Sequence, residues 1–266
     1  MPEGHTLHRV ARQHGALLTG RRVRADSPQG RFAAGARRID GNTVGLVEAY
    51  GKHVFYEIGA AATSLLHVHL GLYGSFRDGP APAPPPRGAV RLRLCTDEHW
   101  IELRGATAAE LITRPERDAI VARLGPDPLR RDANPQAFVT RAGASRAPIA
   151  TLLMDQRTLA GVGNVYRAEL LYRAGIEPHR SGRDVGAGAL AGLWTDAVRL
   201  MRAGLRTGRI VTTDPADRDH PRGPVRPEDA HYVYRRHGLP CRRCRTEIRK
   251  VELAGRNLFW CPICQH

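Results

Sequence analysis

The most specific chemical pattern in the sequence is a pair of Cys-x-x-Cys motifs near the carboxyl end. Cys241 and Cys244 form the first motif, and Cys261 and Cys264 form the second after sixteen intervening residues. Two thiolates at this spacing can face one ion, and two such motifs complete a tetrahedral zinc site with no open position. A redox-active pair is possible for one motif but leaves the other unexplained. The sequence therefore predicts one structural Zn²⁺.

The residues between the two motifs are expected to form a β-hairpin. One strand is predicted over residues 247–253 and the other over 257–260, joined through Ala254, Gly255 and Arg256. Zinc would hold the ends of this hairpin together and leave an arginine at its tip. A zinc-bound hairpin is a general fold element, so the pattern does not by itself say what the hairpin contacts.

The amino terminus carries a second candidate for chemistry. Methionine before a small residue is ordinarily removed, which would leave Pro2 with a free secondary amine and Glu3 beside it. The reference pKa of an α-amino group, about 7.7 to 8.0, leaves a useful fraction unprotonated and nucleophilic near neutral pH. Such an amine can form an iminium with the aldehyde carbon of a sugar. The simpler alternative is that Met-Pro-Glu is only the start of a chain.

A glycine-rich segment before an expected helix is the third candidate. It reads Gly161-Val162-Gly163-Asn164, and asparagine is a residue type that caps helices. The glycines let the backbone approach another molecule closely, and N–H groups at a helix start attract anions. One interpretation is a DNA phosphate site with Asn164 as N-cap, and the other is an ordinary capped helix in a helix–turn–helix hairpin. The residues alone favour neither.

Lysine and histidine give weaker signals. Of the 41 basic residues only Lys52 and Lys250 are lysine, which hints that a compact ammonium is needed there, although two stray lysines also arise by chance. His67 and His69 lie two residues apart on an expected strand and could face one ion. No third ligand is evident nearby in the sequence, so a structural or phosphate-contact role is favoured.

The charge balance points to a polyanionic partner. Lys plus Arg number 41 against 26 Asp plus Glu in 266 residues, a formal net charge of +15 at pH 7. Nucleic acid is the leading partner for such a chain, and an anionic membrane surface is second. An acid stands where a signal peptide would carry basic residues, and no apolar run approaches the roughly 18 residues of a spanning helix. We therefore expect a cytoplasmic protein with no membrane partner.

The amino-terminal part of the chain is expected to be mostly β. Short apolar or alternating runs broken by Gly, Pro and Asn favour a sandwich over βαβ units. Ahead of them, residues 6–18 carry apolar side chains at helical spacing. A Pro-rich segment over residues 80–86 is expected to be a surface loop. The expected strands are residues 44–50, 53–58, 64–70, 90–94 and 99–103.

Helices are expected to dominate the rest. Residues 125–135 have the composition of a linker. Residues 210–229 are polar and lack a period, so we expect a long mobile loop there. The expected helices are residues 136–141, 149–154, 165–174 and 187–205.

Five of these motifs occur in an order that is typical of one family. They are Pro2-Glu3-Gly4, Gly51-Lys52, His69-Leu70-Gly71-Leu72-Tyr73-Gly74, Gly161-Val162-Gly163-Asn164-Val165-Tyr166 and the four cysteines. In this order they resemble the formamidopyrimidine-DNA glycosylase / endonuclease VIII (Fpg/Nei) family over essentially the whole chain. The resemblance implies an α+β fold with an N-terminal helix plus β-sandwich domain, a helix-two-turn-helix domain and a four-cysteine zinc-finger hairpin. The implied domains are residues 1–125, 136–237 and 238–266, with a linker over 126–135.

The resemblance also implies a chemistry for the amino terminus. Pro2, freed of Met1, would attack the anomeric carbon of a flipped nucleotide, expel the damaged base and leave a Schiff base to the opened sugar. Glu3 would act as general acid and base. Lys52 would bind phosphate and assist departure of the leaving group. The Schiff base permits β- and δ-elimination, which cuts the strand and leaves a one-nucleotide gap with phosphate at both ends.

Damaged DNA is the partner that the resemblance implies. Asn164 at the helix start and Arg256 at the hairpin tip would grip the phosphates that flank the lesion, and His69 would contact the DNA as well. Leu72 and Tyr73 would fill the gap left by the extruded nucleotide. We expect no dinucleotide cofactor, a monomer, and association with the bacterial nucleoid.

The details of the motifs lean toward the endonuclease VIII branch and oxidised pyrimidines. The Arg-Arg-Phe-Gly segment of the formamidopyrimidine branch is not found, and residues 103–107 occupy its place. The pair Leu72-Tyr73 also favours the endonuclease VIII branch. Residues 4–6 lack an acidic residue that members often carry, which leaves the proton network there open. Residues 210–229 would occupy the position of the family's base-reading loop, and their sequence indicates no pocket.

Two other functions stay open at this stage. One is a glycosylase specific for 8-oxoguanine and formamidopyrimidine. The other is a non-catalytic nucleic-acid-binding protein that uses the same zinc hairpin and basic surface, with Pro2 and Glu3 idle. Charge and zinc do not separate these functions, whereas a covalent imine with DNA does.

Overall fold

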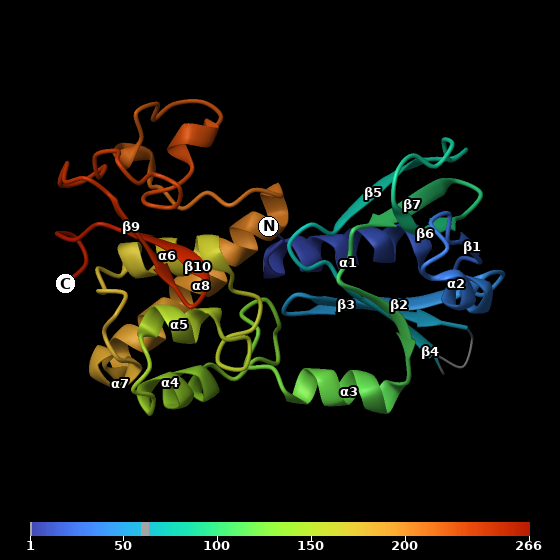
Figure 1. The fold of residues 1–266 in the computed structure, drawn as a ribbon, viewed down its shortest axis with the longest axis horizontal. Coiled ribbons are helices and arrows are strands. Elements are labelled where there is room, and N and C mark those ends of the chain that lie inside the picture. The colour runs from blue at the N-terminus through green and yellow to red at the C-terminus, as the bar shows by residue number, and fades with distance from the viewer. Residues whose placement is uncertain (1, 60–63) are drawn as a thin grey trace. The chain divides into compact units, whose positions relative to one another are not determined.

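The computed structural model of the chain describes residues 2–59 and 64–266. The chain divides into two compact units, one that ends at Arg123 and one that begins at Leu124. Strands dominate the first unit and helices the second (Figure 1). Each unit has a large hydrophobic core of its own. None of the described helices is long and apolar enough to cross a membrane.

Two antiparallel sheets form the first unit, which confirms the predicted sandwich. Within the described residues, one sheet has the strand order β1-β6-β7-β5 and the other β2-β3-β4-β8. Inward side chains of both sheets meet in one core, where Val54, Leu66 and Leu103 are buried. The strands are β1 (Arg24–Asp26), β2 (Val44–Tyr50), β3 (His53–Ile58), β4 (Ser64–His69), β5 (Ser75–Pro80), β6 (Val90–Cys95), β7 (His99–Arg104) and β8 (Ala108–Ile112).

Helix α1 (Gly4–Leu18) is packed into this core against β2 and β3. Leu7 and Leu18 are fully buried, as the helical spacing of apolar residues predicts. His14 lies on the same face, and its Nδ1 is 2.7 Å from the hydroxyl of Tyr56. Burial lowers the pKa of His14 to about 3, so the ring is uncharged in the core. The helix begins two residues before the predicted start at residue 6.

Helix α3 (Arg114–Ala122) was not predicted, although the sequence carries a signal for it. Thr113 and Glu116 form a capping box in which each side chain accepts from the other residue's backbone N–H. The helix covers the outer face of the β2-β3-β4-β8 sheet, where its apolar residues pack around Phe55 and Leu65. A Thr-x-x-Glu pattern at residues 113–116 could have revealed this helix.

Short or polar elements were also missed. Helix α2 (Ala33–Ile39) and the strands β1, β5 and β8 were not predicted. Strand β5 contains Gly79 and Pro80, which usually mark a loop, but it lies at the edge of its sheet. An edge strand tolerates proline because its outward N–H groups have no ladder partner.

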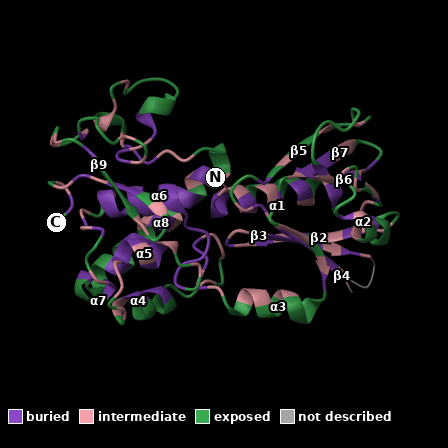
Figure 2. Cartoon of the chain, viewed as in Figure 1, coloured by how far each residue is buried: buried purple, intermediate pink, exposed green. Residues whose placement is uncertain are grey.

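The second unit is a helical body whose main helices match the predicted ones. They are α4 (Pro135–Gly143), α5 (Ile149–Met154), α6 (Asn164–Arg173) and α8 (Ala187–Thr207), with the short α7 (Gly182–Val185) unpredicted. Phe138, Leu170 and Leu193 are among the buried residues of the core that these helices share. Figure 2 shows α6 buried along nearly its whole length, in agreement with the burial of every residue from Asn164 to Tyr172.

A two-stranded hairpin and an irregular segment complete the second unit. Strand β9 (Arg249–Leu253) pairs with β10 (Arg256–Trp260) across a two-residue turn, in which Ala254 and Gly255 both have positive φ. The turn therefore holds Ala254 and Gly255, and the predicted position of Arg256 within it is wrong, because Arg256 pairs with Leu253 as the first residue of β10. Between α8 and the hairpin the chain is irregular except for the 3-10 turns η1 (Pro215–Asp217) and η2 (Pro227–Asp229).

Candidate active site and nucleic-acid interface

Pro2 and Glu3 lie directly before α1, and the helix fixes the backbone next to them. Glu3 occupies the N-cap position, and its carbonyl accepts hydrogen bonds from the N–H groups of Thr6 (2.9 Å) and Leu7 (3.4 Å). Glu3 is fully buried, whereas Pro2 is partly exposed. An accessible proline therefore adjoins a buried acid.

His5 follows these two residues and is itself buried. Burial, and then the charge of Arg9, lowers the pKa of His5 to about 4. Its Nε2 lies 3.3 Å from the hydroxyl of Thr6. The ring is therefore neutral near pH 7 and adds no positive charge beside Glu3.

Lys52 lies in the turn between β2 and β3. Gly51 takes a positive φ of 58° in this turn, and Lys52 is half-buried. His69, the last residue of β4, lies directly opposite His53 at the start of β3. Burial is the main cause that lowers the pKa of both histidines, and the charge of Lys52 contributes to each. Lys52 and His69 therefore lie within electrostatic reach of one another at the same end of the sheet.

The turn after β4 exposes two large apolar side chains. Leu72 is 40% exposed and Tyr73 is 87% exposed. Gly71 has a φ of +67°, and a Cβ there would lie 1.9 Å from the Thr107 hydroxyl. A Cβ at Gly74 would lie 2.2 Å from a backbone carbonyl. Both positions therefore require glycine, and the tight turn that results holds Leu72 and Tyr73 out toward solvent.

The start of α6 differs from the sequence prediction. Gly163 occupies the N-cap position, so the predicted N-cap role of Asn164 is wrong. Asn164 is instead the first residue of the helix and only 6% exposed. The physical reason is that its side chain bonds elsewhere. Its Nδ2 donates to the Asn257 carbonyl (2.9 Å), and its Oδ1 accepts from the Arg167 guanidinium.

Asn164 and Arg167 together bind the zinc hairpin to α6. Arg167 is 1% exposed, and its Nη2 also donates to the Asn257 carbonyl at 3.1 Å. Asn257 directly follows Arg256 on β10. Two side chains of α6 therefore hold the backbone next to Arg256 in place. Arg167 was not predicted as a functional residue, since nothing in the local pattern distinguishes it from other helix arginines.

Gln156 braces the glycine-rich segment before α6. Its Nε2 donates to the carbonyls of Met154 and Val162, both at 2.9 Å. Its Oε1 accepts from the N–H of Gly161 at 3.0 Å. One amide side chain thus closes the turn from both sides and fixes the path of the chain into the helix.

The four cysteines come together as predicted. The Sγ atoms of Cys241, Cys244, Cys261 and Cys264 all lie within 4.8 Å of one another. Two of the Sγ–Sγ separations are 3.8 and 3.4 Å, and a tetrahedral zinc with Zn–S bonds of about 2.3 Å requires sulfurs about 3.8 Å apart. In residues 2–59 and 64–266, no other group of His, Cys, Asp and Glu is arranged to hold a metal ion. The cysteines therefore fit one structural zinc.

Aromatic rings attach the cysteine cluster to α6. The Tyr172 hydroxyl lies 3.1 Å from Cys241 Sγ, and its ring stacks on Tyr232 with centroids 4.7 Å apart. The Arg243 guanidinium lies over both rings, 5.6 and 5.0 Å from their centroids. This stack buries the zinc motif against the helix that carries Asn164.

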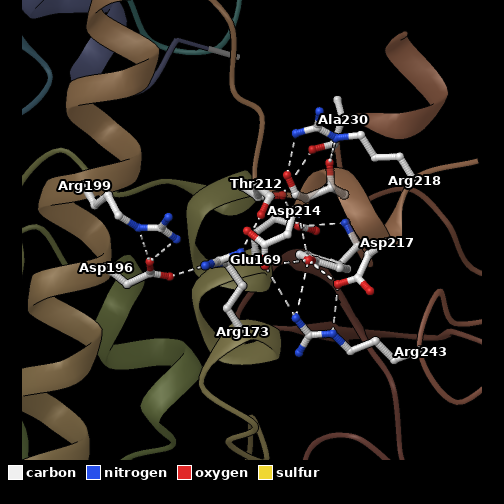
Figure 3. Close-up of polar contacts among 12 residues, drawn as sticks. Glu169, Arg173, Asp196, Arg199, Thr212, Asp214, Asp217, Arg218, Ala230 and Arg243 are labelled. Atoms are coloured by element: carbon white, nitrogen blue, oxygen red, sulfur yellow. Dashed lines mark hydrogen bonds and ion pairs between the residues drawn. The ribbon is translucent and has the colours of Figure 1, made fainter. Parts of the chain in front are cut away.

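The irregular segment after α8 is held by one buried carboxylate (Figure 3). Glu169 on α6 is fully buried and accepts from the N–H groups of Tyr232 (2.7 Å), Val233 (2.9 Å) and Tyr234 (2.8 Å). It also accepts from the hydroxyl of Thr212. Glu169 thereby ties both ends of the segment to α6. A buried carboxylate needs such a set of donors, because an unpaired buried charge is very costly.

Charged residues connect the same segment to α8. Arg173 donates to Asp196 on α8 (2.7 Å) and to the carbonyl of Thr212 (2.6 Å) (Figure 3). A cavity of about 490 Å³ lies between α8 and the segment, with Arg199 and Arg218 among its lining residues. The sequence of residues 210–229 had indicated no pocket, because the cavity needs α8 as its second wall.

Comparison with known proteins decides the family. Residues 1–107 match the formamidopyrimidine-DNA glycosylase N-terminal domain, residues 124–215 its H2TH domain, and residues 238–266 the zinc finger found in FPG and IleRS. The chain belongs to the Fpg/Nei family. Members of the Fpg/Nei family are DNA glycosylases with AP lyase activity, so the chain is a DNA-repair enzyme.

Its relatives within the Fpg/Nei family include both branches. The chain is 48% identical to Endonuclease 8 1 of Mycobacterium tuberculosis over 274 residues, 100% of each chain. It is 30% identical to the formamidopyrimidine-DNA glycosylase of Geobacter sulfurreducens over 278 residues, 100% of this chain and 98% of that one.

Solved structures share the fold. A complex between the LlFpg protein, a THF-DNA and an inhibitor has a TM-score of 0.83 at 22% identity, with 100% of both chains covered. A complex between Lactococcus lactis Fpg and an abasic site containing DNA has a TM-score of 0.82 at 22% identity, with 99% of both chains covered.

We expect Cys261→Ser to lose the bound zinc and DNA binding together, because three thiolates no longer close the site. The hairpin that carries Arg256 would then lose one of its two attachments to α6. Zinc content by atomic absorption and DNA affinity measure both effects. Cys95→Ser, a thiol outside the cluster, is the matched control. Full DNA affinity in zinc-free Cys261→Ser protein would contradict this role.

Proposed function

We propose that this enzyme is a bifunctional DNA glycosylase and AP lyase of base excision repair whose nucleophile is the amine of Pro2. The observation that carries the proposal is the pairing of Pro2 with the fully buried Glu3 at the start of α1. A secondary amine at a chain start is nucleophilic near neutral pH, and an adjacent acid can move the protons that base excision requires.

The proposed reaction begins at the sugar of a flipped nucleotide. The Pro2 nitrogen attacks the anomeric carbon, the bond from that carbon to the base breaks, and the base leaves with a proton from Glu3. The nitrogen then returns its proton to Glu3, and Glu3 passes it to the ring oxygen O4′ as the C1′–O4′ bond breaks, so the ring-opened sugar is an iminium of Pro2. Loss of a C2′ proton expels the 3′ phosphate, and loss of a C4′ proton in a second elimination expels the 5′ phosphate. Lys52 binds phosphate at this site and assists the leaving group.

Residues from both units would grip the DNA. We propose phosphate contacts for Lys52, His69 and Arg256, which are cationic or polar and lie at turns or strand ends. Asn164 belongs to the same grip, and its bond to the Asn257 carbonyl gives it a further role in positioning Arg256. Such contacts are independent of base sequence.

Leu72 and Tyr73 are the proposed wedge. They lie next to each other on a turn that two glycines fix, both are exposed, and neither belongs to the buried core of the first unit. Inserted into the duplex, they would replace the stacking that the extruded nucleotide loses.

We propose oxidised pyrimidines as the favoured lesions. Two observations support this choice: the higher identity to Endonuclease 8 1 than to a formamidopyrimidine-DNA glycosylase, and the Leu72-Tyr73 pair in the turn. The proposal places the enzyme in the cytoplasm as a monomer at the bacterial nucleoid, where a chain of net charge +15 meets its polyanionic substrate.

Pro2→Gly tests the nucleophile. Glycine keeps a free amine but replaces the secondary amine and its ring, so we expect excision and strand cleavage to fall strongly while affinity for an abasic duplex stays nearly unchanged. Single-turnover cleavage and fluorescence anisotropy measure the two quantities. Unimpaired excision would refute the nucleophile assignment, and absent activity in the wild type would favour the non-catalytic alternative.

Arg256→Ala tests the proposed phosphate contact. Removing one such contact should weaken binding to all sequences alike and lower the slope of log K against log salt by roughly one. Arg249→Ala, an exposed arginine at the other end of the hairpin, is the control and should leave the slope unchanged. Equal slopes for wild type and Arg256→Ala would remove Arg256 from the interface.

The lesion class is tested with paired substrates. Wild-type protein should release 5-hydroxyuracil faster than 8-oxoguanine from otherwise identical duplexes, compared as single-turnover rates. Equal or faster release of 8-oxoguanine would place the enzyme in the formamidopyrimidine branch.

A further inference from the structure

The outer face of the β2-β3-β4-β8 sheet carries a chain of hydrogen bonds that the proposed reaction does not use. Glu110 Oε1 lies 2.9 Å from Nδ1 of His67, and Nε2 of His67 lies 2.9 Å from Nδ1 of His53. The residues come from three neighbouring strands, β8, β4 and β3. His67 pairs directly with Glu110, and His53 lies diagonally across from it on the same face.

One carboxylate fixes the proton positions along this chain. An ionised Glu110 can only accept, so Nδ1 of His67 carries the proton and Nε2 of neutral His67 is an acceptor. His53 must then donate from its Nδ1, which leaves its own Nε2 as an acceptor. Both rings are thereby held in the same tautomer and aligned in one direction.

Packing holds the two rings in place. His67 is 4% exposed, and its ring stacks on Phe55 with centroids 5.0 Å apart and an interplanar angle of 17°. The guanidinium of Arg117, from α3, lies over the same Phe55 ring at 5.6 Å. His67 therefore cannot rotate without disturbing the layer beneath α3.

The chain ends at residues of the proposed DNA contact. The ring of His53 lies 4.8 Å from that of His69, centroid to centroid, at an interplanar angle of 54°. Lys52 is the residue before His53, and its charge acts on both rings. The rings of His53 and His67 therefore lie between the carboxylate of Glu110 at one end and Lys52 at the other.

We propose that His53, His67 and Glu110 form a positioning network that fixes His69 and Lys52 for contact with the DNA backbone. The inference rests on the proposed function, since those contacts belong to it. The His53 ring packs 4.8 Å from the His69 ring, centroid to centroid, and His53 directly follows Lys52. Fixing His53 therefore restrains the ring of His69 and the backbone of Lys52. Burial is the main cause that lowers the pKa of His53, His67 and His69, which keeps these three rings uncharged near neutral pH.

Glu110→Gln is the sharpest probe, because the side chain of Glu110 is 55% exposed and glutamine has nearly the same shape. The substitution removes the charge that orders the tautomers. We expect nitrogen-15 spectra of the full chain to show single Nδ1-protonated forms of His53 and His67 in the wild type and mixed tautomers in Glu110→Gln. Affinity for a duplex with a tetrahydrofuran abasic analogue should fall about tenfold, the loss expected for one charge-assisted hydrogen bond.

Glu177→Gln is the matched control. Glu177 Oε1 lies 2.6 Å from Nδ1 of His179, in an exposed pair on the second unit. The same chemical change there should therefore alter neither the His53 and His67 signals nor the affinity for DNA. A merely structural role of Glu110 would not move the tautomers of His53, which lies two hydrogen bonds away.

Two results would overturn the inference: mixed tautomers in the wild type, or altered tautomers in Glu110→Gln with unchanged affinity. Borohydride trapping of the wild type on an abasic duplex separates this failure from that of the proposed function. If the wild type forms the imine and Glu110→Gln binds the duplex with full affinity, the positioning network is refuted and the proposed function stands. If the wild type forms no imine but Glu110→Gln still loses affinity, the proposed lyase chemistry is refuted and the network remains as a group that positions residues for DNA binding.

Discussion

The packing of α1 between the two sheets is the constraint on which the proposed chemistry depends. Leu7 and Leu18 are fully buried there, so the helix cannot shift along its axis without exposing apolar surface. That fixed helix start sets the position of Glu3 and Pro2. A chain terminus is ordinarily the least ordered part of a domain, and here a helix held in the core removes that freedom. A nucleophile at the terminus needs this order to meet one carbon atom repeatedly.

In the second unit, the Asn257 carbonyl is the point at which the zinc hairpin is held beside Arg256. Asn164 and Arg167 both donate to it, and the cysteine cluster packs on the same helix through Tyr172. The zinc hairpin is therefore held to α6 at two places, beside Arg256 and at its base. A small two-stranded hairpin is marginally stable by itself, so zinc and these contacts supply the rigidity that the proposed phosphate contact of Arg256 requires.

Patterns that act locally were readable from the sequence, and contacts between distant residues were not. The cysteine spacing predicted the metal site, and alternation predicted the sandwich. The bond of Asn164 joins residues 93 apart, and no local rule could show that it replaces the expected capping role. The hydrogen bonds from His53 through His67 to Glu110 likewise depend on strand register, because they join residues 14 and 43 apart. Of these residues, the sequence had singled out only His67, together with His69. The helix after Thr113 was the opposite case, because its capping box was present in the sequence and passed over.

The central claim is that the covalent bond to DNA forms at the nitrogen of Pro2. The most direct measurement is mass spectrometry of tryptic peptides after borohydride reduction of the complex with an abasic duplex. The account predicts the reduced sugar adduct on the peptide of residues 2–9, at its amino-terminal nitrogen. An adduct on the side chain of Lys52, or cross-linked protein whose peptide of residues 2–9 is unmodified, would contradict it.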